Sequence, residues 1–302
     1  MVTIDGDCVH LLNKVRAKLD YNGLMNQVQI QKLLPQLQQR YDRLLAQTQE
    51  FPPDGSRPVT VCGRLCGWVS AQALACLAEL SGVKITDEAV HIAWADEPSP
   101  RVDHLLAHIA QVLSEQGLVR SWRGELLDVI GEGQVVGAIE RGVMRPLGFL
   151  TQAVHLNAWG PDDKLWVAKR AAHKSTDPNC WDTLVGGLAA ANEDLEVSLL
   201  RETEEEAGLS AEQVHERGPL RTLLRMHRRL PEGYQVENVI VSNCQLGPDV
   251  QPENQDGEVS EIRLISIDEW YKMAQADQFT IESQLIIIDS IRSRFSARTQ
   301  AA

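Results

Sequence analysis

Apolar residues near the start of the chain recur at three- and four-residue spacing, which is the period of one helical face. Two sets follow it: Leu11, Leu12, Val15 and Leu19, then Leu33, Leu37, Tyr41 and Leu44. The run Phe51-Pro52-Pro53-Asp54-Gly55 then interrupts regular structure, as Pro and Gly clusters do. We therefore expect helices over residues 9–50, within a helical leader that spans residues 1–54.

The next stretch of the chain mixes short strand patterns with helical ones. The segment VTVCGRLCGWV (59–69) is typical of a strand, a turn and a second strand. The pattern predicts helices over 70–81, 86–93 and 101–116, and strands over 121–130 and 135–142. Pro146 and Gly148 mark a boundary near 148–152. We expect a small α+β domain over residues 55–150.

Strands dominate the pattern of the second half. Strands are predicted over 153–160, 164–171, 181–187, 221–229, 234–246 and 261–267. Helices are predicted over about 194–207, 268–274 and 281–295. Strands 153–160 and 164–171 are predicted to form a hairpin, because the turn residues Gly160-Pro161-Asp162-Asp163 lie between them. Strands 221–229 and 234–246 are predicted to form a second hairpin across Pro231-Glu232-Gly233. Mixed strands with few helices favour an α/β sandwich over residues 151–302, rather than a doubly wound sheet.

Composition adds the broad class of protein. The chain has 302 residues, of which 43% are hydrophobic and 24% charged, as in soluble globular proteins. No apolar run reaches the roughly 18–20 residues of a membrane span. The first residues lack the basic start and apolar core of a signal peptide. The six Cys residues show no zinc-site spacing. We expect free thiols, no membrane partner and a cytoplasmic location.

The negative charge is uneven along the chain. The net charge of −13 divides into −3 for residues 1–150 and −10 for residues 151–302. The second half therefore repels a nucleic-acid backbone, which excludes duplex nucleic acid as an expected partner. A small anionic ligand can still bind there if a cation lies between the like charges.

The segment RETEEEAGL (201–209) concentrates this negative charge. Gly208 predicts the end of a helix, because Gly adopts the left-handed conformation there without strain. The glutamates then lie near the negative end of the helix dipole, where they repel each other. Such a cluster indicates a positive partner that the sequence itself does not supply.

A helical wheel separates the glutamates into two groups. Glu202, Glu205 and Glu206 share one arc, whereas Glu204 points elsewhere and is expected to be solvated. The face that packs on the sheet is predicted from its small and apolar residues: Val197, Leu200, Thr203 and Ala207. Three carboxylates on one rigid face form a hard-oxygen site that suits Mg²⁺ or Mn²⁺. A plain solvated acidic face is the alternative.

Fixed spacings around this helix resemble a known motif. Gly187, Glu193, Arg201-Glu202, Glu205-Glu206 and Gly208-Leu209 are similar to the Nudix box, GX5EX7REUXEEXGU, with Thr203 where an aliphatic residue is usual. The resemblance implies a Nudix fold, with a mixed sheet between helices, and hydrolysis of a diphosphate joined to another group.

The same resemblance implies roles for individual residues of the motif. Glu202, Glu205 and Glu206 would bind the metal. Glu193 and Arg201 would brace the loop–helix–loop by pairing with each other. Gly187 would let the backbone approach the metal closely.

Two flanking stretches look like one branch of the Nudix proteins, the one related to thiamine pyrophosphokinase. They are RAAHKSTDPNCWDTLVGGL (170–188) and QPENQDGEVSEIRLISIDEW (251–270). Residues 59–70 and 121–129 resemble the N-terminal domain of that branch. The branch implies a small diphosphate substrate: thiamine diphosphate, its oxidised analogues, or another nucleotide-like diphosphate.

Four further residues gain candidate roles from these stretches. Arg170 and Lys174 would contact the diphosphate, and Asp182 would orient them. Glu258 would activate water as a general base or serve as a further metal ligand, with Glu205 as the other candidate base. Plain surface charges remain the alternative for all of them.

Two rival functions fit the same fold. Cys180 suits an isopentenyl-diphosphate isomerase, although the isomerase box is usually less complete than this one. A metabolite-binding regulator without activity is the second rival, although such domains commonly lose box glutamates. We further expect the substrate pocket to be shared between the two halves of the chain. The sequence leaves the oligomeric state open, with a homodimer as one option.

Overall fold

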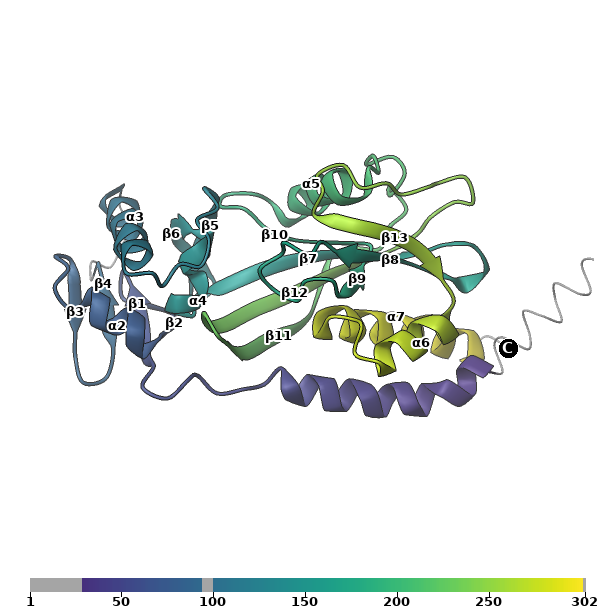
Figure 1. Ribbon diagram of the computed structural model, residues 1–302, viewed down its shortest axis with the longest axis horizontal. Helices are drawn as coiled ribbons and strands as arrows, with labels where there is room; N and C mark the ends of the chain where they lie inside the picture. The colour runs from purple at the N-terminus through teal and green to yellow at the C-terminus, as the bar shows by residue number, and fades with distance from the viewer. Residues whose placement is uncertain (1–28, 94–99, 301–302) are drawn as a thin grey trace, which may run out of the picture.

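The computed structural model describes residues 29–93 and 100–300 (Figure 1). A first helix covers residues 29–47. The part of the predicted leader over residues 9–28 lies outside the described residues. No helix of the described ranges combines the length and apolar character needed to cross a membrane.

The elements between this helix and residue 150 are short. They are β1 (Arg57–Val61), β2 (Arg64–Val69), α2 (Ala71–Leu77), β3 (Val83–Ile85), β4 (Val90–Ile92), α3 (Pro100–Glu115), β5 (Leu126–Gly131), β6 (Gln134–Glu140), the 3-10 turn η1 (Arg141–Val143) and α4 (Met144–Leu147).

The second half contains the longer strands. Its elements are β7 (Leu150–Trp159), the 3-10 turn η2 (Pro161–Asp163), β8 (Leu165–Arg170), β9 (Trp181–Thr183), β10 (Val185–Leu188), α5 (Leu195–Ala207), β11 (Arg221–Leu230), β12 (Gly233–Gln245), β13 (Val259–Ile265), α6 (Ile267–Gln275) and α7 (Ile281–Gln300).

A seven-stranded sheet organises the second half. Its strands run in the order β11-β12-β7-β8-β13, with β10 paired to β7 and β9 paired to β8. Strand β12 pairs with β7 in parallel, whereas the other pairs are antiparallel. The predicted mixed sheet and both predicted hairpins are therefore confirmed.

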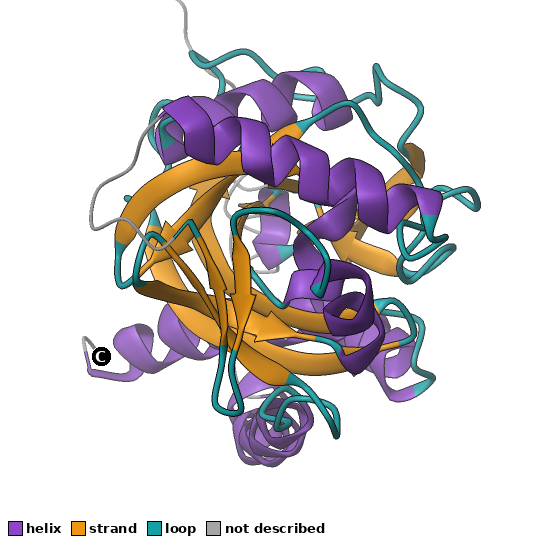
Figure 2. Ribbon diagram, turned by 90° about the vertical axis from the view of Figure 1, so that its left-hand side faces the viewer, coloured by secondary structure: helices purple, strands orange, loops and turns teal. Residues whose placement is uncertain are grey.

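Alternation along the strands divides the core between the two faces of this sheet. Leu156 and Ala158 of β7 pack with α5, whereas Leu165 and Val167 of β8 pack with α6 and α7. Figures 1 and 2 show helices on opposite sides of the strands. The predicted sandwich of a sheet between helices is confirmed.

The first half has its own core, which lies beside one end of the large sheet. A four-stranded sheet of order β2-β1-β4-β3 and the β5–β6 hairpin pack around α3. The backbone N–H of Ala191 donates to the Leu126 carbonyl at 2.8 Å. The backbone N–H of Asn192 donates to the Asp128 carboxylate at 3.1 Å. These bonds hold the hairpin next to the loop that precedes α5.

Three predicted elements differ from the structure. The helix expected over 86–93 is wrong, because Val90 and Ile92 alternate into the core and β4 pairs in parallel with β1. The strand expected over 121–130 begins only at Leu126. The single strand expected over 181–187 is two strands, β9 and β10, which pair with different neighbours. In the first and third cases a partner distant in sequence decides the local structure.

Candidate functional site

Helix α5 carries the clustered glutamates and has a cap at each end. The Asp194 side chain accepts a hydrogen bond from the Glu196 N–H at 2.9 Å, which satisfies a free donor of the first turn. Gly208 ends the helix in the left-handed conformation, with φ 62° and ψ 23°, as predicted. The two caps fix the length of the helix and therefore the positions of its carboxylates.

The packed face of α5 is rotated from the predicted one. Leu199, Thr203 and Ala207 are buried, but Leu200 is only partly buried and Val197 is 54% exposed. The prediction was wrong for Val197, because the helix turns its glutamate arc toward the glycines of β10. Glu204 is exposed, as predicted.

Two of the glutamates on α5 are buried against β10. The Gly186 N–H donates to the Glu206 carboxylate at 2.8 Å. A Cβ atom at Gly187 would overlap the carboxylate of Glu202, so a larger residue there would displace that carboxylate. Burial raises the pKa of Glu206 to about 8, although Lys174 opposes this shift. Burial also raises the pKa of Glu202.

Arg201 connects the glutamates of the helix to the loop before it. Its guanidinium donates two hydrogen bonds of 3.0 Å to Glu193, and one Nη1 atom reaches Glu202 at 2.9 Å and Glu205 at 3.0 Å. Hydrogen bonds from Arg201 lower the pKa of Glu193 to about 2, against the opposing effect of burial. One cation therefore neutralises part of the acidic face.

Lys174 lies opposite the helix, among the carboxylates. Its Nζ atom is 3.7 Å from the Glu206 carboxylate and forms an ion pair with Glu258. Burial by itself would raise the pKa of Glu258, but the hydrogen bond and charge of Lys174 lower it below the ordinary value. Arg141 and Arg123, from the first half of the chain, lower this pKa further.

Arg170 and Asp182 form a second ion pair next to Lys174. The Arg170 Nη1 atom is 3.3 Å from the Asp182 carboxylate. Arg170 also donates to the Thr176 carbonyl at 3.0 Å and 3.2 Å, which ties the loop after β8 to the strand. Asp182 accepts from the Thr183 N–H at 2.8 Å, so the carboxylate that faces Arg170 is fixed in place.

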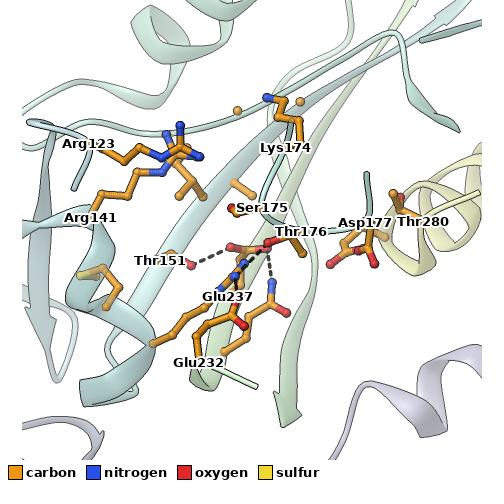
Figure 3. Close-up of a pocket in the computed structure, with 18 of the residues that line it drawn as sticks. Arg123, Arg141, Thr151, Lys174, Ser175, Thr176, Asp177, Glu232, Glu237 and Thr280 are labelled. Carbon is orange, nitrogen blue, oxygen red and sulfur yellow. Dashed lines mark hydrogen bonds and ion pairs between the residues drawn. The ribbon is translucent and has the colours of Figure 1, made fainter. Parts of the chain in front are cut away.

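A cavity of about 180 Å³ extends from these residues toward the first half of the chain. Arg123, Arg141 and Lys174 lie toward the top of the view in Figure 3, and Glu232 and Glu237 lie toward the bottom. The lining of the cavity includes residues from both halves of the chain, as expected if the two halves share the substrate pocket.

Hydrogen bonds at the end of β6 position the two arginines of the first half. The buried Glu140 carboxylate accepts from the Arg123 N–H at 2.8 Å. The Arg141 side chain donates to Glu125 at 2.7 Å, and its backbone N–H donates to the Glu125 carbonyl at 2.8 Å. These bonds hold the loop before β5 over the cavity.

The carboxylates of α5 are candidate ligands for a divalent cation. In residues 29–93 and 100–300, no group of three or more His, Cys, Asp or Glu side chains is arranged around one point. The Arg201 guanidinium lies between Glu202 and Glu205 instead. The donor set itself fits Mg²⁺ or Mn²⁺, because it consists of carboxylate oxygens and Gly187 leaves room beside them.

The structure brings most of the sequence-predicted site residues to one place. Five of them line this cavity: Arg170, Lys174, Asp182, Gly187 and Glu258. A smaller adjoining pocket includes Glu206. Cys180 is absent from the described lining of both pockets.

Sequence reasoning missed the residues that close the cavity from the other side. They are Arg123 and Arg141, from the first half, and Gln235, Glu237 and Glu282, from β12 and α7. Arg123 lies within a stretch that the sequence analysis did notice, 121–129. The β12 and α7 residues carry no local signal, because their burial depends on contacts with segments distant in sequence.

Comparisons with known proteins find a family similarity in the second half. The NUDIX domain family model matches residues 150–284. Nudix hydrolase 24, chloroplastic, of Arabidopsis thaliana is 30% identical over 203 residues, covering 64% of this chain and 54% of the relative. Nudix hydrolase 20, chloroplastic, of the same plant is 28% identical over 193 residues, covering 61% and 50%.

The chain thus spans about half the length of these curated relatives. Among solved structures, the crystal structure of DR0079 from Deinococcus radiodurans is similar with a TM-score of 0.42 and 21% identity. That similarity covers 55% of this chain and 99% of the other.

Proposed function

Residues 150–284 form a NUDIX domain, and from this premise we propose that the chain is an enzyme that hydrolyses a diphosphate linkage with Mg²⁺ or Mn²⁺. One observation carries the proposal: Glu206 of the acidic face of α5 and the cations Lys174 and Arg170 line one small pocket that adjoins the cavity. A diphosphate needs both kinds of group, since its oxygens bind metal ions and basic side chains.

The acidic face supplies the metal ligands in this proposal. Glu202, Glu205 and Glu206 would hold the cation, which neutralises phosphate charge and makes a bound water more acidic. Arg201 keeps its bonds to Glu193 and so fixes the loop before the helix while the carboxylates turn to the cation. Gly187 keeps the space beside Glu202 free.

Two carboxylates are candidates for the general base. Glu258 lies on the loop before β13 and beside the cavity, and its lowered pKa keeps it ionised. Its ion pair with Lys174 must loosen before it accepts a proton. Substrate phosphate provides a competing partner for Lys174. Glu205, which is half-exposed on the helix, is the second candidate.

The basic side chains bind the phosphates. Lys174 and Arg170 would contact the diphosphate, and Asp182 would hold the Arg170 guanidinium in orientation. Arg123 and Arg141 extend the positive side of the cavity from the first half of the chain. Substrate binding is therefore a task of both halves.

For the substrate, we propose a small nucleotide-like diphosphate, with thiamine diphosphate or an oxidised analogue as the first candidate. The resemblance of residues 170–188 and 251–270 to one Nudix branch supports this choice. The isomerase alternative loses support, because Cys180 lies outside the described cavity lining. A regulator without activity would not need the full set of box glutamates that this chain retains.

A screen of diphosphate metabolites with Mg²⁺ and Mn²⁺ tests the proposal. Products are separated by chromatography, so that cleavage of terminal and internal diphosphates is detected alike. Thiamine diphosphate should give thiamine monophosphate and phosphate. Isomerisation of isopentenyl diphosphate without phosphate release would favour the isomerase. Metabolite binding without any product would favour the regulator.

A further inference from the structure

The cavity has a second wall that the proposed hydrolysis does not use. We call it the acceptor wall, and it consists of the following acidic and amide side chains: Asp177, Glu232, Gln235, Glu237 and Glu282. Figure 3 shows Glu232 and Glu237 toward the bottom of the view, with Arg123 and Lys174 toward the top. The two walls therefore differ in charge.

Arginines already neutralise two carboxylates of the acceptor wall. Arg145 forms an ion pair with Glu232, and Arg228 forms one with Glu282 at 3.1 Å. Glu237 has no ion pair with any residue of the described ranges. It is 8% exposed, and its carboxylate accepts from the Thr151 hydroxyl at 2.7 Å and from the Gln235 amide at 2.9 Å.

The amide of Gln235 is held in one orientation by this contact. Only its Nε2 atom can donate to the Glu237 carboxylate, so Oε1 must point the other way. Gln235 is 4% exposed, and in the described part of the chain its Oε1 atom has no hydrogen-bond partner. Buried acceptors are normally paired, so this one is open to a donor from a ligand or from a bound water.

Strand register gives the separation of the two ends of the cavity along the direction of β7. On β7, Thr151 is opposite Glu237 and Val154 is opposite Gly187. Three residues of strand separate these positions by roughly 10 Å. The apolar side chains of Met144, Phe149 and Val236 also line the cavity. A ring would find apolar contact there, with acceptors at its edge.

We propose that Gln235 and Glu237 recognise the N–H groups of an amino-substituted heterocycle, carried by the substrate at the end remote from its diphosphate. The placement of the diphosphate beside Lys174 and Arg170 in this assignment rests on the proposed function. Aminopyrimidines and aminopurines share the required chemistry. A prenyl diphosphate does not, because it would leave the Gln235 Oε1 atom without a donor.

Binding of monophosphates to the full chain with Mg²⁺ tests this assignment apart from catalysis. Titration calorimetry compares thiamine monophosphate, an aminopyrimidine, with AMP, an aminopurine, and with isopentenyl monophosphate, which has no N–H group. At least one of the two amino heterocycles should bind roughly tenfold more tightly than isopentenyl monophosphate, or better. Which one does so identifies the ring.

Two variants of the acceptor wall give the second arm of the test. Glu237→Gln and Gln235→Met should each lose that preference while binding isopentenyl monophosphate as the wild type does. The exposed Glu212→Gln, outside the cavity lining, is the control and should behave as the wild type. Thermal melts check that each variant is folded. If one variant does not fold, the other decides.

Several outcomes would overturn the assignment: equal binding of all three probes, no binding of either amino heterocycle, or unchanged preference in a folded variant. The proposed hydrolysis is judged separately by product formation from the corresponding diphosphates. Preference without hydrolysis would leave the recognition standing and remove the hydrolase. Hydrolysis without a preference for amino heterocycles would support the hydrolase and remove the proposed recognition.

Discussion

Arg201 and Lys174 show how single residues make the acidic face of α5 tolerable. Arg201 touches Glu193, Glu202 and Glu205, and Lys174 lies between Glu206 and Glu258. Each cation reduces repulsion between carboxylates that would otherwise raise one another's pKa. Substitutions within this network should therefore separate metal binding, proton transfer and stability.

The first prediction compares neighbouring glutamates of α5. Glu205→Gln should keep the fold but lower the rate of diphosphate hydrolysis about 10³-fold or more, because a carboxylate that we propose as a metal ligand is lost. Glu204→Gln, on the exposed side of the helix, should lose little. Steady-state kinetics and circular dichroism measure both. Equal losses at the two positions would contradict the one-face arrangement.

The second prediction concerns Glu258, which lies on a loop rather than on the helix. Glu258→Gln should lower kcat by roughly 10²–10⁴, the range for a lost general base, and change KM little. Calorimetric titration with Mg²⁺ should match the wild type. Loss of metal binding would make Glu258 a ligand, and full kcat would make it a surface residue.

The third prediction uses the lowered pKa of Glu193. A carboxyl whose folded pKa is about 2 stabilises the fold above its ordinary value of 4.5, and loses this effect as pH falls from 4.5 toward 2. Glu193→Gln should reduce the free energy of unfolding by about 2 kcal/mol at pH 7. Urea unfolding at several pH values should show that the difference in the free energy of unfolding between the wild type and Glu193→Gln narrows below pH 4.5. A gap independent of pH would argue against the Arg201 pair.

Helix 29–47 shows how one element supports a core that lies far away in sequence. Its Ile30, Leu37 and Leu44 are buried in the same cluster as Trp270 of α6 and Ile288 of α7. The Arg40 side chain also donates to the Gln284 side chain at 2.8 Å. The helix therefore completes one outer layer of the sandwich formed by the second half, although it precedes the first-half core in the chain.

The fourth prediction tests this layer. Leu37→Ala should lower the free energy of unfolding by about 2–5 kcal/mol, as expected for a fully buried leucine. Gln39→Ala, on the exposed side of the same helix, should change it little. Denaturant unfolding measures both variants. A small effect at Leu37 would mean that the helix packs on the second half without stabilising it.

At the scale of the whole molecule, the cavity depends on how the two halves meet. The loop before β5 and the end of β6 bring Arg123 and Arg141 over a site whose other residues follow residue 150. Neither half of the chain encloses these groups by itself. Ligand sites commonly lie where two packed units of a protein meet, as these halves do.

The fifth prediction tests the contribution of the first half. Arg123→Gln should raise KM roughly tenfold, because a charged hydrogen-bond donor to phosphate is lost from an exposed position. Arg101→Gln, an exposed arginine of α3 outside the cavity lining, is the matched control. Kinetics with the best substrate of the screen measure both. An unchanged KM in Arg123→Gln would leave substrate binding to the second half.

The sequence by itself determined the features that depend on near neighbours along the chain. The glutamate spacing from 202 to 206, the helix end at Gly208 and the hairpin turns at 160–163 and 231–233 follow from local periodicity and backbone preference. The resemblance to the Nudix box then indicated which glutamates could bind a metal ion. These features were predictable because their causes lie within a few residues.

Only the tertiary structure decided which segments distant in sequence meet. The exposure of Val197, the strand β4 and the acceptors Gln235 and Glu237 depend on contacts between distant segments. Strand β12 pairs in parallel with β7, and such pairing leaves no local mark on either strand. A helical wheel gives the faces of a helix but not the neighbour that each face meets. The shape of the cavity, and with it the choice of substrate, therefore arises from long-range packing.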